Sequence, residues 1–211
     1  MRGRKIKRRV AKARVLRLRR AELPHDTVEL ARYLIGKTVV HDSEVGRLAG
    51  RIVETEAYPV GDAAGHAFTG QSEANRSLFL QHGHAYVRFL YGSCWIFNIS
   101  SEKKGIGAGV LVRAIEPIEG IDQMMRHRGV TRLADVARGP GRLTEALDID
   151  KRFDGIDLFD GKGVIWLGRA VRPTGKIGVS TRIGLSREAH RLLRFYERGS
   201  AYVSGPKKLS V

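Results

Sequence analysis

The chain has 211 residues, of which 42% are hydrophobic, so it is long enough for one well-packed core and short for two full domains. Its single cysteine, Cys94, excludes an internal disulfide framework and a zinc site built from clustered cysteines. No apolar run approaches the length of a membrane span, and secretory features are absent. We therefore expect one globular domain in a reducing, intracellular setting.

The net charge of +16 is concentrated at the start of the chain. Residues 1–20 hold eleven Lys and Arg, whereas all 22 Asp and Glu lie within residues 21–211. Such a segment repels itself and stays extended until it meets a polyanion, of which nucleic acid is the obvious one. A solvated or targeting segment is the alternative, although transit peptides are usually rich in Ser and this stretch has none. The pattern predicts a disordered basic arm over 1–20 and a folded domain over 21–211.

Hydrophobic periodicity predicts a mixed α/β (α+β) fold. Asp26 and Glu29 flank the start of a helical pattern that ends at Gly36. From Lys37 the period changes to two, which predicts a largely antiparallel sheet with strands over 37–41, 48–58, 84–91, 94–99 and 109–115.

Two helices are expected in the second half of the chain, separated by loops. Past Pro117 the pattern is helical over 118–127, and Gly139-Pro140 opens another helix. Two later segments, 164–167 and 180–184, have the composition of strands.

The segment from Arg51 to Tyr58 carries the first candidate chemistry. Alternation along a strand places Ile52, Glu54, Glu56 and Tyr58 on one face, with Glu56 and Tyr58 about 7 Å apart. A carboxylate beside an aromatic plate could hold a planar base next to a water molecule. A strand whose solvated side carries charge explains the same eight residues.

A second candidate is the run from Tyr86 to Asn98, in which two strand-like segments meet at Gly92-Ser93. Tyr91 lies at the bend, where an aromatic side chain is poorly placed to reach the core. It could act as a wedge between base pairs, filling the gap left by an extruded nucleotide. A tyrosine folded back onto its own hairpin is the alternative.

Together these segments resemble the alkyladenine (3-methyladenine) DNA glycosylases of the vertebrate and bacterial type. The resemblance runs from about Glu22 to Ser204. It rests on six ordered landmarks besides the Tyr91-Gly92 bend: Arg51 to Tyr58, Asp62 to His66, Phe97 to Ser100, Val112 to Pro117, Gly139 to Leu143 and Arg194 to Tyr196.

The resemblance implies a role for each matched position. Glu56 would be the general base, and Arg113 would help hold Glu56 and the attacking water. Tyr58 and His66 would line the pocket for the flipped base, with Asn98 as a discriminator on the pocket floor.

Further matched positions would contact water and DNA. The backbone carbonyl of Ile183 would be a third contact to the water, and Tyr91 would be the intercalating wedge. Gly141 and Arg142 would meet the DNA backbone at the start of a helix.

The implied protein is a monomeric, monofunctional DNA glycosylase without cofactor or metal. It would flip alkylated or deaminated purines out of double-stranded DNA, hydrolyse the N-glycosidic bond and leave an abasic site. Its fold would be a single domain around a curved antiparallel sheet with a protruding β-hairpin. It would act with DNA, in a bacterial cytoplasm or a nucleus.

Two positions depart from the family pattern. Arg88 stands where the family generally has a tyrosine that stacks on the base. Either the substrate range leans toward neutral lesions, or Arg88 turns outward to phosphate while Tyr86 supplies the aromatic surface. Ala74 precedes Asn75 where family members commonly carry an arginine.

Two other classes of function fit parts of the sequence. A non-catalytic nucleic-acid-binding protein would use the basic arm and leave Glu56 as a surface charge. A metal-dependent nuclease would need ligands such as His82 and His84, but two histidines without a placed third ligand are more often surface residues.

Overall fold

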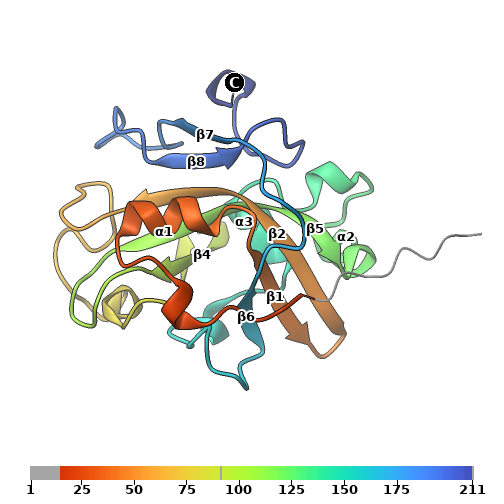
Figure 1. Ribbon diagram of the computed structural model, residues 1–211, viewed down its shortest axis with the longest axis horizontal. Coiled ribbons are helices and arrows are strands. Elements are labelled where there is room, and N and C mark those ends of the chain that lie inside the picture. The colour runs from red at the N-terminus through yellow and green to blue at the C-terminus, as the bar shows by residue number, and fades with distance from the viewer. Residues whose placement is uncertain (1–14, 91, 211) are drawn as a thin grey trace, which may run out of the picture.

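The computed structural model in Figure 1 describes residues 15–90 and 92–210; residues 1–14, 91 and 211 lie outside that description. In the described chain, eight strands form one curled, antiparallel sheet, and three α-helices pack against it. This arrangement confirms the expected mixed α/β fold built on a single curved sheet. No helix in the described part is long and apolar enough to cross a bilayer.

Six strands form the main path of the sheet, in the order β3 (Ala85–Leu90), β4 (Cys94–Ser100), β5 (Gly109–Glu119), β2 (Gly46–Tyr58), β1 (Thr38–Ser43) and β6 (Ile165–Gly168). Two further strands, β7 (Ile177–Ser180) and β8 (Arg194–Glu197), pair with each other, and β8 also pairs with β2. Figure 1 shows β7 and β8 together at one end of the molecule. The expected hairpin is formed by β3 and β4, which pair from Ala85–Ile99 to Leu90–Cys94.

The central strand β2 is covered on every side where it carries the two glutamates. It pairs with β5 along one edge, while β1 and then β8 occupy the other. Glu54 lies opposite Ala114 of β5 and Tyr196 of β8. Both Glu54 and Glu56 have no exposed surface, which excludes the interpretation of this strand as one with a solvated, charged face.

Helix α1 (Thr27–Leu34) fixes one face of β2. Its N-cap, Asp26, accepts hydrogen bonds from the N–H groups of Val28 and Glu29, as the sequence predicted. The Thr55 hydroxyl of β2 donates to the carbonyl of Ala31 at 2.9 Å, which ties the helix to the strand. Leu30 and Leu34 of the helix are fully buried in the main hydrophobic core.

Helices α2 (Ile121–Arg128) and α3 (Pro140–Ala146) cover the other end of the sheet. The expected start of α2 near residue 118 was wrong, because β5 continues through Pro117, at a register shift against β2, to Glu119. The helix begins only after Gly120, whose φ of 72° turns the chain. The start of α3 at Pro140 agrees with the sequence.

Near the C-terminus one prediction was wrong and one strand was missed. The strand expected over 180–184 lies earlier, because β7 ends at Ser180 and the following residues form a loop. Strand β8 was not predicted, since all four of its residues are buried and two of them, Arg194 and Glu197, are charged. Alternation of polar and apolar residues gives no signal for such a strand.

Residues 15–20, which the sequence assigned to the basic arm, contact the folded body. Arg17 forms a bridge with Gly168, and the N–H of Leu18 donates to the carbonyl of Leu167 at 2.9 Å. Leu18 is 5% exposed and belongs to the main core. Residues 1–14 lie outside the description, so the basic arm there stays a prediction.

Candidate active site

A cavity of about 360 Å³ opens beside the end of β2. This volume falls within the roughly 300–1,000 Å³ of typical small-molecule sites. Its wall brings together six of the residues predicted from the sequence, namely Tyr58, His66, Tyr86, Asn98, Arg113 and Ile183. They come from β2, β3, β4, β5 and two loops, so the fold gathers positions that are up to 125 residues apart.

Glu56 lies beneath this wall, and its carboxylate is held by three donors. One oxygen, Oε2, accepts from the Tyr58 hydroxyl at 2.9 Å and from Arg113 at 3.1 Å. The other, Oε1, accepts from the backbone N–H of Ile183 at 2.8 Å. The three groups that bind Glu56 also line the cavity, so the carboxylate is one side chain away from the enclosed space.

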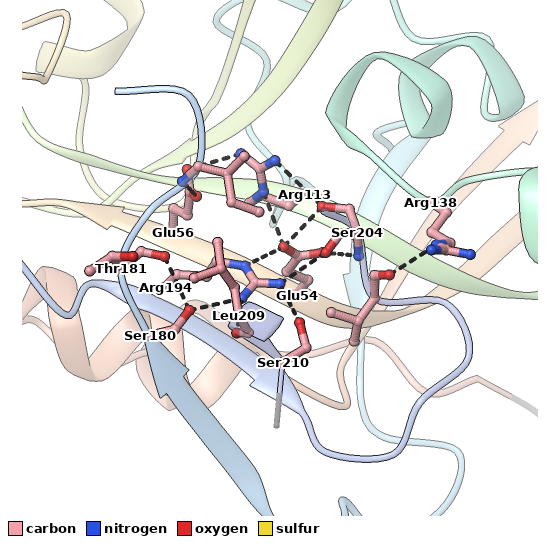
Figure 2. Close-up of polar contacts among 12 residues, drawn as sticks. Glu54, Glu56, Arg113, Arg138, Ser180, Thr181, Arg194, Ser204, Leu209 and Ser210 are labelled. Atoms are coloured by element: carbon pink, nitrogen blue, oxygen red, sulfur yellow. Dashed lines mark hydrogen bonds and ion pairs between the residues drawn. The ribbon is translucent and has the colours of Figure 1, made fainter. Parts of the chain in front are cut away.

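Glu54 binds the Arg113 guanidinium on the side opposite Glu56. Figure 2 shows Arg113 reaching Glu56 on one side and the Glu54–Ser204 pair on the other. Glu54 also accepts from Arg194 at 2.6 Å and from the N–H and hydroxyl of Ser204 at 2.6 and 3.0 Å. Four donors therefore occupy a carboxylate that has no exposed surface.

Arg194 extends this network to the C-terminal segment. Its guanidinium donates to the Ser180 hydroxyl, to the carbonyls of Ser204 and Leu209, and to the Ser210 hydroxyl (Figure 2). The donor inventory of a buried arginine is thereby filled, which a fully buried cation requires.

The surrounding charges fix the protonation states of Arg113 and Tyr58. Burial by itself would lower the pKa of the Arg113 guanidinium, but the carboxylates of Glu56 and Glu54 raise it. Burial and then the Glu56 carboxylate raise the pKa of Tyr58 well above its usual value. Tyr58 therefore stays protonated and donates a hydrogen bond to Glu56.

A second ion pair holds the two loops that frame the cavity. Arg182 and Asp62 are both fully buried as side chains and lie 2.5 Å apart. Arg182 also donates to the carbonyl of Ala57 at 3.0 Å, and its guanidinium stacks on the Tyr58 ring at 4.5 Å. Since Ile183 follows directly, this contact fixes the N–H group that binds Glu56.

The opposite wall is formed by Tyr86 and His66. The Tyr86 hydroxyl lies 3.1 Å from His66 Nδ1, and the two rings meet edge to face. Burial raises the pKa of Tyr86 to about 12, and burial followed by the nearby Arg88 charge lowers the pKa of His66. Both side chains are therefore neutral at pH 7. The Asn98 amide donates to the Tyr86 carbonyl at 3.2 Å.

Arg88 lies on β3 between two residues of the wall but is not part of it. Tyr86, Leu90 and the cross-strand neighbour Ile96 all line the cavity. Arg88 NH1 donates to the Ala74 carbonyl at 3.0 Å, and its Nε is buried without a hydrogen-bond partner in the described chain. Its predicted contact with the DNA backbone stays a prediction.

The remaining predicted positions lie around the cavity or outside the description. Pro140 lines the cavity, Gly141 packs against Cys94, and Arg142 is exposed. Tyr91 lies outside the described residues, so its role as a wedge stays a prediction, as does the water contact of the Ile183 carbonyl.

The histidine pair shows no arrangement for a metal. His82 packs edge to face on His25, and His84 Nδ1 lies 2.7 Å from the Gln81 carbonyl. No group of three or more His, Cys, Asp or Glu side chains within residues 15–90 and 92–210 could hold a metal ion.

Sequence reasoning missed the charges behind the wall. Glu54 and Asp62 were noted only as parts of motifs, and Arg182, Arg194 and Ser204 received no role. Glu54 and Arg194 lie in strand segments with apolar neighbours, as in Arg194-Phe195-Tyr196-Glu197, which is the one signal the sequence offers for them. Solvated charges on a strand give the same pattern.

Comparisons with known proteins identify the family of this chain. The family model of methylpurine-DNA glycosylases matches residues 21–201. A protein of Mesorhizobium japonicum, provisionally named a 3-methyladenine DNA glycosylase, is 60% identical over 90% of this chain and 91% of its own. Proteins with the same provisional name from Paraburkholderia phytofirmans and Methanoculleus marisnigri are 55% and 42% identical, over 93% and 85% of this chain and 92% and 94% of their own.

The family match covers the sheet and the cavity wall, and the high identity extends along the length of the relatives. The chain therefore belongs to the methylpurine-DNA glycosylase family and is a DNA repair glycosylase of the 3-methyladenine type, a hydrolase of N-glycosyl bonds.

Proposed function

We propose that this glycosylase flips an alkylated or deaminated purine out of double-stranded DNA into the cavity. A water molecule activated by Glu56 then hydrolyses the N-glycosidic bond and leaves an abasic site. The chain acts as a monomer and without lyase activity. The absence of lysine from the cavity wall, within the described chain, supports the last point because a lyase needs an amine nucleophile.

One observation carries the mechanism, namely the hydrogen-bond inventory of Glu56. An ionised carboxylate offers about four lone-pair sites. Three are taken by Tyr58, Arg113 and Ile183 among the described residues. The remaining site is on Oε1, the oxygen that binds Ile183, and in the proposed mechanism it accepts a hydrogen bond from the reacting water.

The reaction follows from that position. Glu56 takes a proton from the water, whose oxygen forms the new bond to the sugar C1′. The electron pair of the C1′–N bond leaves with the purine, and the negative charge that Glu56 still carries in the transition state stabilises the positive character that develops on the sugar. An alkylated, cationic purine leaves as a neutral base, whereas a neutral lesion leaves with negative charge and takes a proton from water or from the enzyme.

The cavity wall suits a planar base. Tyr58, His66 and Tyr86 offer π-faces and edges, and at pH 7 all three are neutral. Asn98 fixes the Tyr86 backbone and presents a polar group to the floor. Recognition therefore depends on stacking and shape together with a few hydrogen bonds.

The decisive test is single-turnover base release from duplexes carrying hypoxanthine, ethenoadenine or 7-methylguanine, with chelator present throughout. Glu56→Gln keeps the size of the side chain and removes the base, so release should slow by at least about 10²-fold. Binding to the same duplexes, measured by fluorescence anisotropy, should be unchanged. Glu44→Gln, at an exposed position in the β1–β2 turn, is the control and should release base at the wild-type rate.

Other outcomes separate the alternatives. Base release that survives Glu56→Gln would refute the proposed base. Binding without release from any lesion would favour a non-catalytic nucleic-acid-binding protein. Strand breaks that appear without alkali and vanish with chelator would indicate a metal-dependent nuclease.

A further inference from the structure

Arg88 places an unneutralised charge against the cavity wall. Its neighbours along and across the sheet, Tyr86, Leu90 and Ile96, line the cavity. The guanidinium is tied to the Ala74 carbonyl at 3.0 Å, and its Nε is buried and unpaired in the described chain. The side chain is therefore turned along the wall and is half-buried rather than extended into solvent.

The charged side chains that line the cavity, Asp62 and Arg113, are paired. Arg113 lies between Glu54 and Glu56, and Arg182 pairs with Asp62. Asp154, which influences Tyr86, pairs with Lys151 at 2.7 Å. Arg88 has no carboxylate within ion-pair distance among residues 15–90 and 92–210. A base in the cavity would therefore lie near a cation that no described carboxylate pairs with.

We infer that Arg88 determines the substrate class of this pocket, because its charge disfavours purines that are themselves cationic and so biases excision toward neutral lesions. This inference rests on the proposed function. Low-dielectric surroundings strengthen the effect, since charges near a buried site are poorly screened. Burial and then the Arg88 charge lower the pKa of His66, so the same charge that disfavours a cationic purine also disfavours a protonated histidine in this wall.

The experiment compares two substrates in four proteins. Single-turnover release is measured at saturating enzyme from duplexes carrying cationic 7-methylguanine or neutral hypoxanthine, each divided by the uncatalysed rate. The proteins are the wild type, Arg88→Met, Arg88→Lys and Arg76→Met. Arg76 is exposed, pairs with Glu73 and lies two residues after Ala74, so its replacement removes the same net charge from a nearby surface.

Arg88→Met should raise the ratio of 7-methylguanine to hypoxanthine release by about tenfold, the expected effect of one charge at roughly 12 Å in an effective dielectric of about 20. Arg88→Lys and Arg76→Met should leave the ratio within about twofold of wild type. Arg88→Gln removes the charge but keeps a hydrogen-bond donor for the Ala74 carbonyl, so it should show the same ratio as Arg88→Met. It takes the place of Arg88→Met in the experiment if the methionine variant does not fold.

Three results would overturn the inference. The ratio could stay constant in both neutral variants, it could change equally in Arg76→Met, or both rates could fall together through weakened DNA binding, as expected for a phosphate contact. Failure of the wild type to release any base would instead contradict the proposed function, so the two failures are distinguishable.

Discussion

Glu54 and Glu56 lie two residues apart on β2 and are equally buried, but their contacts differ. Glu54 accepts four hydrogen bonds, from Arg113, Arg194 and two atoms of Ser204, three of them on Oε1 and one on Oε2. Glu56 accepts three and keeps one site. The proposed division of roles follows: Glu54 positions Arg113, and Glu56 can bind the reacting water.

Ser204 allows that division to be tested without removing a charge. Its hydroxyl donates to Glu54 at 3.0 Å and lies 3.4 Å from Arg113, while its N–H holds Glu54 independently. Ser204→Ala should cost about 1–2 kcal/mol of unfolding free energy and slow base release by up to about tenfold. Urea titration and single-turnover release measure the two effects. Ser186→Ala, at an exposed position, should change neither; equal behaviour of both variants would argue against the positioning role.

At the scale of single residues, the sequence predicted the residues of the cavity wall but not the buried charges that hold this wall in place. The resemblance indicated Tyr58, His66, Asn98 and Arg113, all of which line one cavity. Glu54 and Arg194 were not assigned, because a buried ion pair has the same sequence signature as two solvated charges. Their burial depends on β8 closing against β2, a long-range contact that local patterns do not encode.

Two loops frame the cavity at the scale of structural elements. One follows β2 and contains Asp62; the other follows β7 and contains Arg182. The buried pair between them also holds the Ala57 carbonyl and the Tyr58 ring, so it sets the position of the peptide that binds Glu56. Neither loop is anchored by a strand at this point, and the ion pair supplies that anchor.

Breaking this pair should affect both stability and catalysis. Asp62→Asn leaves the Arg182 charge buried without its partner, which costs about 3–5 kcal/mol in comparable cases. We expect a lower urea midpoint and slower base release, because the Ile183 N–H loses its fixed position. Asp122→Asn, at an exposed position in α2, serves as the control. An unchanged midpoint would contradict the anchoring role.

Elements with a strong local signal were predicted well. Asp26 caps α1, Gly139-Pro140 opens α3, and alternation indicated β1 to β5. The predicted start of α2 near residue 118 was wrong because the pairing of β5 with β2 continues past the proline. A proline normally ends a strand because it has no N–H to donate. Pro117 lies at a register shift between β5 and β2, where the missing N–H costs little.

The acid stability of the whole molecule should depend on Glu197. Burial would raise the pKa of this carboxyl, but hydrogen bonds from Arg51, Gly175 and Arg172 lower it from 4.5 to about 2. A carboxyl with a lowered pKa stabilises the fold above pH 4.5, and that contribution disappears as the pH falls toward 2. Urea unfolding at pH 7, 4 and 3 should show this decline in the wild type.

Glu197→Gln should be less stable at pH 7 and lose less stability between pH 4.5 and 2. Glu44→Gln should follow the wild-type curve, because its side chain is exposed. Parallel curves for wild type and Glu197→Gln would refute the assignment.

The basic segment gives a prediction for DNA binding by the whole molecule. Residues 1–14 carry eight Lys and Arg, whereas residues 15–20 pack on the body and should be retained. Deleting residues 1–14 should flatten the plot of log affinity against log salt by about 0.9 for each phosphate that this segment neutralises. Fluorescence anisotropy between 50 and 300 mM salt, roughly the range in which such slopes are measured, provides the comparison. An unchanged slope would mean that the segment does not contact DNA.

The network around Glu54 also constrains how the protein is made. Glu54 meets Arg194 and Ser204 only 140 and 150 residues later in the chain. At a synthesis rate of about 5–20 residues per second, that separation corresponds to roughly 7–30 seconds on the ribosome. During this interval Glu54 has Arg113 but lacks Arg194 and Ser204, and Glu56 lacks the Ile183 N–H, so a sheet closed around them would leave both carboxylates short of donors. We therefore expect the nascent chain to keep the centre of β2 open to water and the site around Glu56 to assemble late in biosynthesis.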